Sequence, residues 1–175
     1  MSQLPAATVQ NRLLTINVND TPMPAIDGIS LTPLFLDREN GTWDLYGRFA
    51  PGTTLPTHYH TGTVHFFTTK GAWNYAEHPD DPQTAGSYLY EPGGSMHSFT
   101  VAADAVEDAE GFMVVHGANV NFVDGQFHDI TDASSLEDLF QAVGQMPGMP
   151  ALHWFRPGEA QKRDLVGTAE TKAAE

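Results

Sequence analysis

Short apolar runs rich in valine, threonine and aromatic residues alternate along this chain with turns formed by glycine and proline. Apolar and polar positions that alternate between turn residues are typical of half-buried strands. The pattern predicts strands at residues 13–18, 31–37, 42–50, 64–69, 72–77, 87–90, 95–101, 112–116, 119–123 and 126–130. Asn40-Gly41 and Asp124-Gly125 are tight-turn dipeptides that predict hairpins. Since no helix separates these runs, an antiparallel sandwich or barrel is favoured.

One segment near the C-terminus follows a helical period instead. Residues 134–143 start with Ser134, a capping residue, and carry acidic residues in the early turns. Apolar residues recur at helical spacing in Leu136, Leu139, Phe140 and Val143. The segment predicts a short helix that packs across one end of the barrel or at a subunit contact. Beyond Pro157 the residues turn small and charged, so we expect one domain over residues 10–157 and a mobile tail over residues 158–175.

The composition sets limits on the chemistry. The chain has 175 residues, of which 41% are hydrophobic and 17% charged, which suits one globular domain with a proper core. It contains no cysteine, so disulfides, thiolate zinc sites and thiol nucleophiles are excluded. Histidine, aspartate and glutamate remain as metal ligands.

The charge excludes two classes of partner. Eight lysine and arginine residues stand against 22 aspartate and glutamate residues, a formal charge of −14 at pH 7. Nucleic acid and anionic membranes would be repelled. The N-terminus has no secretory pattern, and no apolar run approaches the ~20 residues of a membrane span. We expect a cytoplasmic protein, and a homodimer or larger homo-oligomer built on the flanking strands and the helix.

Three histidines carry the strongest chemical signal. His58 and His60 are two residues apart on an extended segment, so their side chains lie on one face. His97 follows the turn at Pro92-Gly93-Gly94, which can direct it back toward them. Three neutral imidazoles without a nearby thiolate suit a divalent first-row transition metal.

These residues resemble the two motifs of the cupin superfamily. Gly52 stands five residues before His58-Tyr59-His60, as in the first motif. Gly86, Pro92-Gly93-Gly94 and His97 reproduce the spacing of the second motif. The resemblance implies an all-β, single-domain jelly-roll barrel with a short C-terminal helix. It also implies a metal inside the mouth of the barrel, held by His58, His60 and His97.

The glutamate that usually completes the first motif is missing. Its position falls on Val64. His65 beside it could replace that glutamate only if the strand register shifted by one residue, which would turn it to the other face. His65 is otherwise a candidate for a hydrogen bond to a ligand or to substrate. Three histidines alone also form a metal face with open positions.

Two glutamates near the motifs are candidates for different roles. Glu77 shares a strand face with Trp73 and Tyr75, and can reach the metal as a fourth ligand or act as a base. Alternatively, it lies at the solvent edge before the loop that follows. Glu91, directly before Pro92, is interpreted as a turn residue. The apolar pocket wall, or ordinary barrel core, is expected to comprise Tyr46, Phe66, Trp73, Tyr75 and Phe99.

Within the superfamily, the chain resembles the 2,4'-dihydroxyacetophenone dioxygenase group. The resemblance rests on residues 58–65, 75–77, 85–95 and 117–122. It implies non-haem Fe(II), a small-molecule carbonyl substrate (a hydroxyketone or diketone), and dioxygen that cleaves the carbon–carbon bond beside the carbonyl. Glu77 falls at a position that belongs to that group's active site. The acetylacetone-cleaving dioxygenases, whose iron site has three histidines, are similar as well.

Two other functions remain open at this point. The same barrel and ligands would suit a non-oxidative metal enzyme, an isomerase or lyase, or a non-catalytic metal-binding sensor. Zinc, nickel and copper are also compatible with the ligand set.

Overall fold

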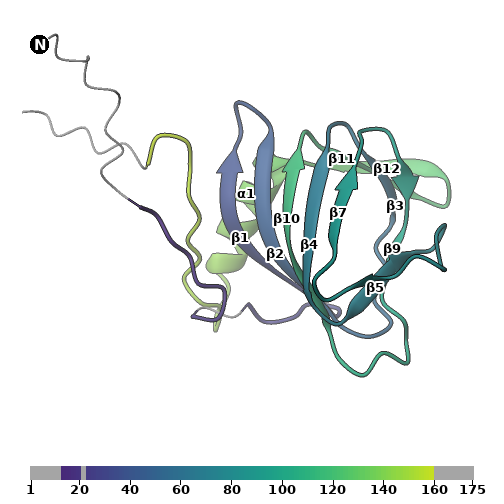
Figure 1. Cartoon of the computed structure of the whole chain (residues 1–175). Helices are drawn as coiled ribbons and strands as arrows, with labels where there is room; N and C mark the ends of the chain where they lie inside the picture. The colour runs from purple at the N-terminus through teal and green to yellow at the C-terminus, as the bar shows by residue number, and fades with distance from the viewer. Residues whose placement is uncertain (1–12, 21–22, 160–175) are drawn as a thin grey trace, which may run out of the picture.

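Two facing layers of antiparallel strands form an open barrel in the computed structural model, which describes residues 13–20 and 23–159. Figure 1 shows the larger sheet from its outer side. Its five strands, in spatial order, are β1 (Ile29–Asp37), β2 (Thr42–Phe49), β10 (Ala109–His116), β4 (Val64–Lys70) and β7 (Tyr88–Glu91). The all-β barrel predicted from the sequence is confirmed.

The second layer contains two smaller sheets. The four-stranded sheet has the order β12 (Gln126–Thr131), β11 (Asn119–Val123), β3 (Thr57–His60) and β8 (Met96–His97). A three-stranded sheet follows, with the order β6 (Gln83–Thr84), β5 (Ala72–Tyr75) and β9 (Phe99–Thr100). The core between the layers is rich in aromatic residues and includes Phe49, Phe66, Trp73 and Phe99.

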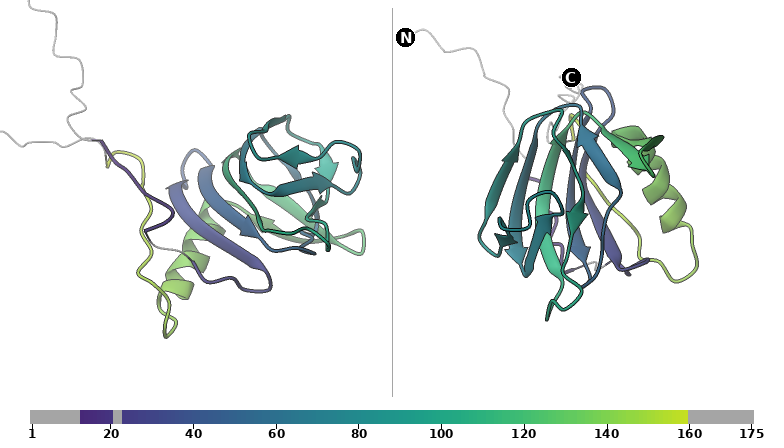
Figure 2. Two further views of the ribbon diagram at one scale, coloured as in Figure 1. Left: turned by 60° about the horizontal axis from the view of Figure 1, so that its bottom comes forward. Right: turned by 90° about the vertical axis from the view of Figure 1, so that its right-hand side faces the viewer.

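The predicted helix is confirmed as α1 (Ala133–Gly144). Its cap is Asp132 rather than Ser134, because the Asp132 carboxylate accepts hydrogen bonds from the backbone N–H groups of Ser134 and Ser135. Figure 2 shows α1 alongside the two sheets, where it contacts β1 and β12. Its buried residues include Leu136 and Phe140, which extend the core beneath the larger sheet.

Two predicted strands differ in the structure. Residues 13–17 are irregular and a turn follows at 18–20, in which the N–H of Asp20 donates to the carbonyl of Asn17. The predicted strand 95–101 is divided into β8 and β9, since the chain crosses from the four-stranded to the three-stranded sheet between His97 and Phe99. This crossing leaves His97 beside β3.

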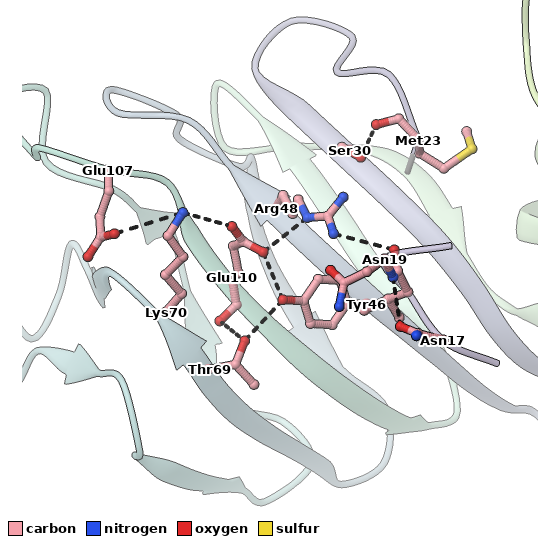
Figure 3. A network of polar contacts seen from close by, with 11 residues as sticks. Asn17, Asn19, Met23, Ser30, Tyr46, Arg48, Thr69, Lys70, Glu107 and Glu110 are labelled. Atoms are coloured by element: carbon pink, nitrogen blue, oxygen red, sulfur yellow. Dashed lines mark hydrogen bonds and ion pairs between the residues drawn. The ribbon is translucent and has the colours of Figure 1, made fainter. Parts of the chain in front are cut away.

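The outer face of the larger sheet carries a charged network (Figure 3). The Glu110 carboxylate accepts hydrogen bonds from Tyr46 at 2.8 Å, Arg48 at 3.0 Å and Lys70 at 3.2 Å. These contacts tie β2, β10 and β4 together. Tyr46, expected in the pocket wall, therefore points to the opposite side of its sheet, because its neighbour Leu45 takes the inward position.

The ends of the chain complete the description. Residues 10–12 and 160–175 lie outside the described residues, so the proposed domain start and the mobile tail remain predictions. Within the described part, no helix is both long and apolar enough to cross a membrane.

Candidate metal centre

The three motif histidines converge inside the barrel. His58 and His60 point inward from β3, and His97 on β8 is the direct cross-strand partner of His58. Their exposed fractions are 6%, 5% and 3%, and one ring nitrogen from each lies within 4.8 Å of the others. The prediction that these three side chains meet at one point is confirmed.

The turn before His97 fixes this convergence. The N–H of Gly94 donates to the His60 carbonyl at 2.8 Å, and Gly94 has a φ of +89° that favours glycine. A Cβ on Gly93 would lie 3.0 Å from the carbonyl oxygen of Thr61. The two glycines therefore let the turn lie directly against the end of β3, which brings β8 into register.

The histidines are held neutral, as metal ligands must be. Burial, with the neighbouring His58 and His97, lowers the pKa of His60 to about 3. Burial, with His58 next in effect, lowers the pKa of His97 to about 4. The Nδ1 of His58 lies 2.8 Å from the carbonyl of Pro56, and an Nδ1–H donated there leaves Nε2 free as a ligand.

A carboxylate that sequence reasoning missed joins the cluster. Glu91, at the end of β7, is 5% exposed, and its Oε2 lies 3.4 Å from His60 Nε2 and 3.3 Å from His97 Nε2. Its other oxygen accepts a hydrogen bond from the hydroxyl of Tyr75, whose ring stacks on His97 with centroids 4.0 Å apart. Glu91 is thus no mere turn residue.

The position of Glu91 explains the missing motif glutamate. Glu91 is the cross-strand partner of Val64, the residue at the usual glutamate position. Partners in an antiparallel pair project to the same face. The neighbouring strand therefore supplies a carboxylate where the first motif lacks one.

Unsatisfied polar atoms show that the site fits a cation. His97 Nε2 and Glu91 Oε2, which face each other, are both buried without a hydrogen-bond partner. Burial raises the pKa of Glu91, although the hydrogen bond from Tyr75 opposes this. Imidazole nitrogens and a carboxylate oxygen that face each other at 3.3–3.4 Å in a buried site without a hydrogen bond are costly unless a cation lies between them. Bonds of about 2.1 Å to one ion give ligand separations of this size.

Among the described residues, Glu77 and His65 are not part of the buried group that converges at the site. Glu77 is exposed beyond the end of β5, and its carboxylate accepts hydrogen bonds from the backbone N–H of Ser98 at 2.9 Å and the Ser98 hydroxyl at 3.0 Å. Burial alone would raise the pKa of Glu77, but these bonds hold it below its usual range. The structure thus joins Glu77 to the residue after His97 rather than to the histidine cluster.

His65 points to the outer face of the larger sheet. Val64 is buried inward, so the alternation of β4 turns His65 outward, where its Nδ1 lies 2.7 Å from the Tyr88 hydroxyl. The register shift that would make it a ligand does not occur in this structure.

Two cavities adjoin the cluster. A small one of about 60 Å³ is lined by His58, His60 and Glu91, together with the predicted wall residues Phe66, Trp73, Tyr75 and Phe99. A larger one of about 340 Å³ shares His58 and Asn119 with it. Its walls are mostly apolar, with polar residues along β11 and β12, and include Leu31, Leu45, Phe49, Met113, Asn121, Asp129 and Thr131. The cluster therefore opens onto space for a small molecule.

Comparison with known families decides the classification. The profile of the ChrR Cupin-like domain family matches residues 12–120, which include all three histidines and Glu91. This chain belongs to the cupin superfamily. Solved structures agree: this cupin is 39% identical to a Ralstonia eutropha JMP134 protein of unknown function with a cupin-like fold, over 86% of this chain and 95% of that chain, with a TM-score of 0.78.

More distant structures extend the comparison. An RmlC-like cupin from the same organism is 25% identical over 79% of this cupin and 91% of that chain, with a TM-score of 0.71. An acetylacetone dioxygenase from Acinetobacter johnsonii is 20% identical over 81% of this cupin and 99% of that chain, with a TM-score of 0.64. At that identity the likeness shows the fold alone. No curated protein matches this cupin.

Proposed function

We propose that this cupin is an Fe(II)-dependent dioxygenase that cleaves the carbon–carbon bond beside a carbonyl in a hydroxyketone or diketone. Its partners are then a small-molecule carbonyl substrate and dioxygen. The observation that carries the proposal is a buried set of neutral histidines with an unsatisfied carboxylate oxygen, open to an apolar cavity of about 340 Å³. The fold shared with an acetylacetone dioxygenase supports it.

The chain's own residues have distinct roles in this proposal. His58, His60 and His97 hold the metal, and Glu91 supplies the nearest carboxylate. When bound, ferrous iron supplies polarisation of the carbonyl and one-electron chemistry with dioxygen. The apolar cavity walls exclude water from the substrate.

Glu91 is also the candidate base. Loss of a proton from the carbon beside a carbonyl needs an acceptor near that carbon. Glu91 lies beside the histidines and lines the smaller cavity. The Tyr75 hydroxyl holds one of its oxygens and leaves the other without a hydrogen-bond partner. Glu77 and His65, expected in this role from the sequence, lie farther along their strands or on the outer face, so the geometry favours Glu91.

Dioxygen uptake tests the proposal. The purified protein is loaded anaerobically with Fe(II), mixed with a β-diketone or an aromatic hydroxyketone, and exposed to dioxygen in an oxygen electrode. One dioxygen consumed per substrate cleaved, lost in His97→Ala, is the expected result. Phe67→Ala on the outer face of the larger sheet is the matched control and should retain uptake.

Other outcomes separate the competing functions. Substrate conversion without dioxygen uptake, with Zn(II), Ni(II) or Fe(II), would replace the proposal with an isomerase or lyase. Tight metal binding without conversion of any such carbonyl compound would favour a metal sensor. The cavity of about 340 Å³ beside His58 argues for a small-molecule reaction over metal sensing alone.

A further inference from the structure

The larger cavity has two unlike walls. The apolar wall belongs to the larger sheet and includes Leu45 and Met113. The polar wall belongs to the four-stranded sheet, in which Asn121 on β11 and Asp129 on β12 are cross-strand partners (Figure 1). Asn121 also pairs with His58, and partners in register share a face. The two polar side chains therefore lie on the inner face of the sheet, beside the histidine cluster.

The side-chain amide of Asn121 has a fixed orientation. Its Nδ2 donates hydrogen bonds to Asp129 Oδ1 at 2.6 Å and to Thr131 Oγ1 at 2.9 Å. An ionised carboxylate only accepts hydrogen bonds, so the amide nitrogen must face β12. Both N–H hydrogens are then used, and the planar amide turns Oδ1 away from β12. No side chain or backbone N–H of the described residues donates to this oxygen, so Asn121 offers the cavity an acceptor.

Asp129 adds a negative charge to the same wall. Its side chain is 58% exposed and lines the cavity, so it lies where the cavity meets solvent. The described residues that line the cavity include no lysine or arginine, and Asp129 is the one carboxylate among them. An anionic compound that entered would lose its hydration without gaining an opposite charge. The formal charge of −14 of the whole chain adds to this repulsion.

We infer that Asn121 and Asp129 determine the charge specificity of the larger cavity, because they favour an uncharged compound with a hydrogen-bond donor over an anionic compound of the same shape. The inference rests on the proposed function in taking this cavity as the substrate site. A donor on the compound satisfies Asn121 Oδ1, while the apolar wall holds its hydrocarbon part. A site built to accept a hydrogen bond discriminates against compounds that lack the donor.

Binding of two matched compounds tests the inference. 4-Acetylbenzamide is uncharged and donates from its amide, whereas 4-acetylbenzoate has nearly the same shape and a negative charge. Both are titrated calorimetrically into the zinc-loaded protein at pH 8, which keeps histidine side chains neutral. Zinc can bind a carboxylate directly in every variant. The quantity compared between variants is therefore the preference for the amide, the ratio of the two dissociation constants.

Asp129→Asn removes the charge and keeps both the side-chain volume and an acceptor for Asn121. The preference for the amide should fall about 3- to 10-fold. Asp80→Asn is the matched control, because Asp80 is an exposed carboxylate in the loop between β5 and β6, outside the cavity lining. It changes the net charge equally, and the preference should change less than twofold. Equal changes in the two variants, or a preference that Asp129→Asn leaves unaltered, would overturn the inference.

Asn121→Leu removes the acceptor and keeps a side chain of similar size. The affinity for 4-acetylbenzamide should fall about 3- to 10-fold, whereas that for 4'-methylacetophenone, which carries no donor, should change less than twofold. Equal losses for both compounds would mean that Asn121 only shapes the wall, and would remove its assigned role. Circular dichroism checks the fold of each variant. If Asn121→Leu does not fold, the comparison of Asp129→Asn with Asp80→Asn decides the inference.

Failure of this inference differs from failure of the proposed reaction. The expected binding results without dioxygen uptake by the iron-loaded protein would refute the dioxygenase and leave the charge specificity standing. Dioxygen uptake together with equal effects of Asp129→Asn and Asp80→Asn would refute the charge specificity alone. Binding of none of the three compounds would also refute it.

Discussion

Glu91 and Glu137 are both almost fully buried, with exposed fractions of 5% and 6%, yet their surroundings are opposite. Glu137 on α1 accepts hydrogen bonds from Arg156 at 2.7 and 3.0 Å and from Arg38 at 3.3 Å. The hydrogen bonds from Arg156, together with the charges of both arginines, hold the pKa of Glu137 below its usual range. Glu91 faces two neutral imidazoles and a tyrosine hydroxyl, and burial raises its pKa.

The difference separates a carboxylate that is paired with arginines inside the fold from one that has an oxygen free to bind a cation. Two arginines of the same chain, Arg38 and Arg156, pair with the Glu137 carboxylate. Glu137 therefore stabilises the contact of α1 with its neighbours. Among the described residues, one oxygen of Glu91 has no hydrogen-bond partner. A buried charge in that state destabilises the metal-free fold and is compensated when a cation binds.

Replacing Glu91 should have the largest effect on the site. In Glu91→Gln the carboxylate charge is lost while the side-chain volume is kept, so we expect metal affinity to fall about 10- to 100-fold. The melting temperature of the metal-free variant should not fall, because a buried and unpaired charge is removed. Calorimetric titration with Zn(II) or Fe(II) measures the affinity. Unchanged affinity, or a metal-free variant that is clearly less stable, would contradict the role assigned to Glu91.

The pH dependence of stability tests whether the histidines beside Glu91 are neutral in the folded protein. The pKa values of His60 and His97 are about 3 and about 4 in the folded protein, against an ordinary 6.5, so the unfolded chain binds more protons between these values. Stability of the metal-free protein is therefore full above about pH 6.5 and is lost as the pH falls toward 4. From pH 7 to pH 5.5 we expect the two histidines to lower the free energy of unfolding by about 2–3 kcal/mol, measured with urea after chelation.

The two glutamates should change this profile in different ways. The raised pKa of Glu91 opposes the histidines, because the folded state then holds a proton that the unfolded chain releases. Glu91→Gln should therefore make the loss of stability toward pH 5.5 steeper. Glu137→Gln should leave this part of the profile parallel to that of the wild type, since the pKa of Glu137 is lowered and titrates at more acidic pH. A flat wild-type profile would refute the neutral, buried state of the histidines.

Removing the charge of Glu137 should affect stability alone. Arg38 and Arg156 are about half exposed, with side-chain exposures of 55% and 46%, so water compensates part of the lost pairing. We expect Glu137→Gln to lower the free energy of unfolding at pH 7 by about 1–2 kcal/mol, as measured by urea denaturation. Metal affinity should change less than twofold. A fall in affinity comparable to that of Glu91→Gln would remove the contrast between the two residues.

Local patterns were sufficient to predict most of the fold. A tight turn such as Asn40-Gly41 and the alternation of apolar and polar residues in a strand depend only on residues that are close in the sequence. Both predicted hairpins, β1–β2 and β11–β12, form in the structure. His58 and His60 share a face because strand geometry requires it. The failure at residues 13–18 has a matching cause: an alternating run becomes a strand only if another strand is available to pair with it.

Predicting that Glu91 lies at the site required the pairing of two strands, which the sequence alone does not give. Glu91 reaches the cluster because β7 pairs with β4 so that Glu91 lies opposite Val64, and β5 and β6 lie between these two strands in the sequence. The sequence contained one indication of this. Because Val64 occupies the position where the first motif usually has a glutamate, a carboxylate from a neighbouring strand could have been expected there. The inward position of Val64 also decides that His65 faces outward.

The smallest expected effect is that of replacing Glu77. This replacement tests whether the carboxylate at the metal site is Glu77, which the family resemblance favoured, or Glu91, which the geometry favours. Both Glu77 oxygens are engaged by Ser98, directly after His97, so Glu77 acts on the cluster by positioning that segment. A glutamine can still accept the hydrogen bond from the Ser98 N–H, and its amide can donate to the hydroxyl. Glu77→Gln should therefore change metal affinity and turnover by about threefold or less. A loss of about 10- to 100-fold in Glu77→Gln, with Glu91→Gln unaffected, would instead make Glu77 the metal ligand and require this segment to rearrange when metal binds.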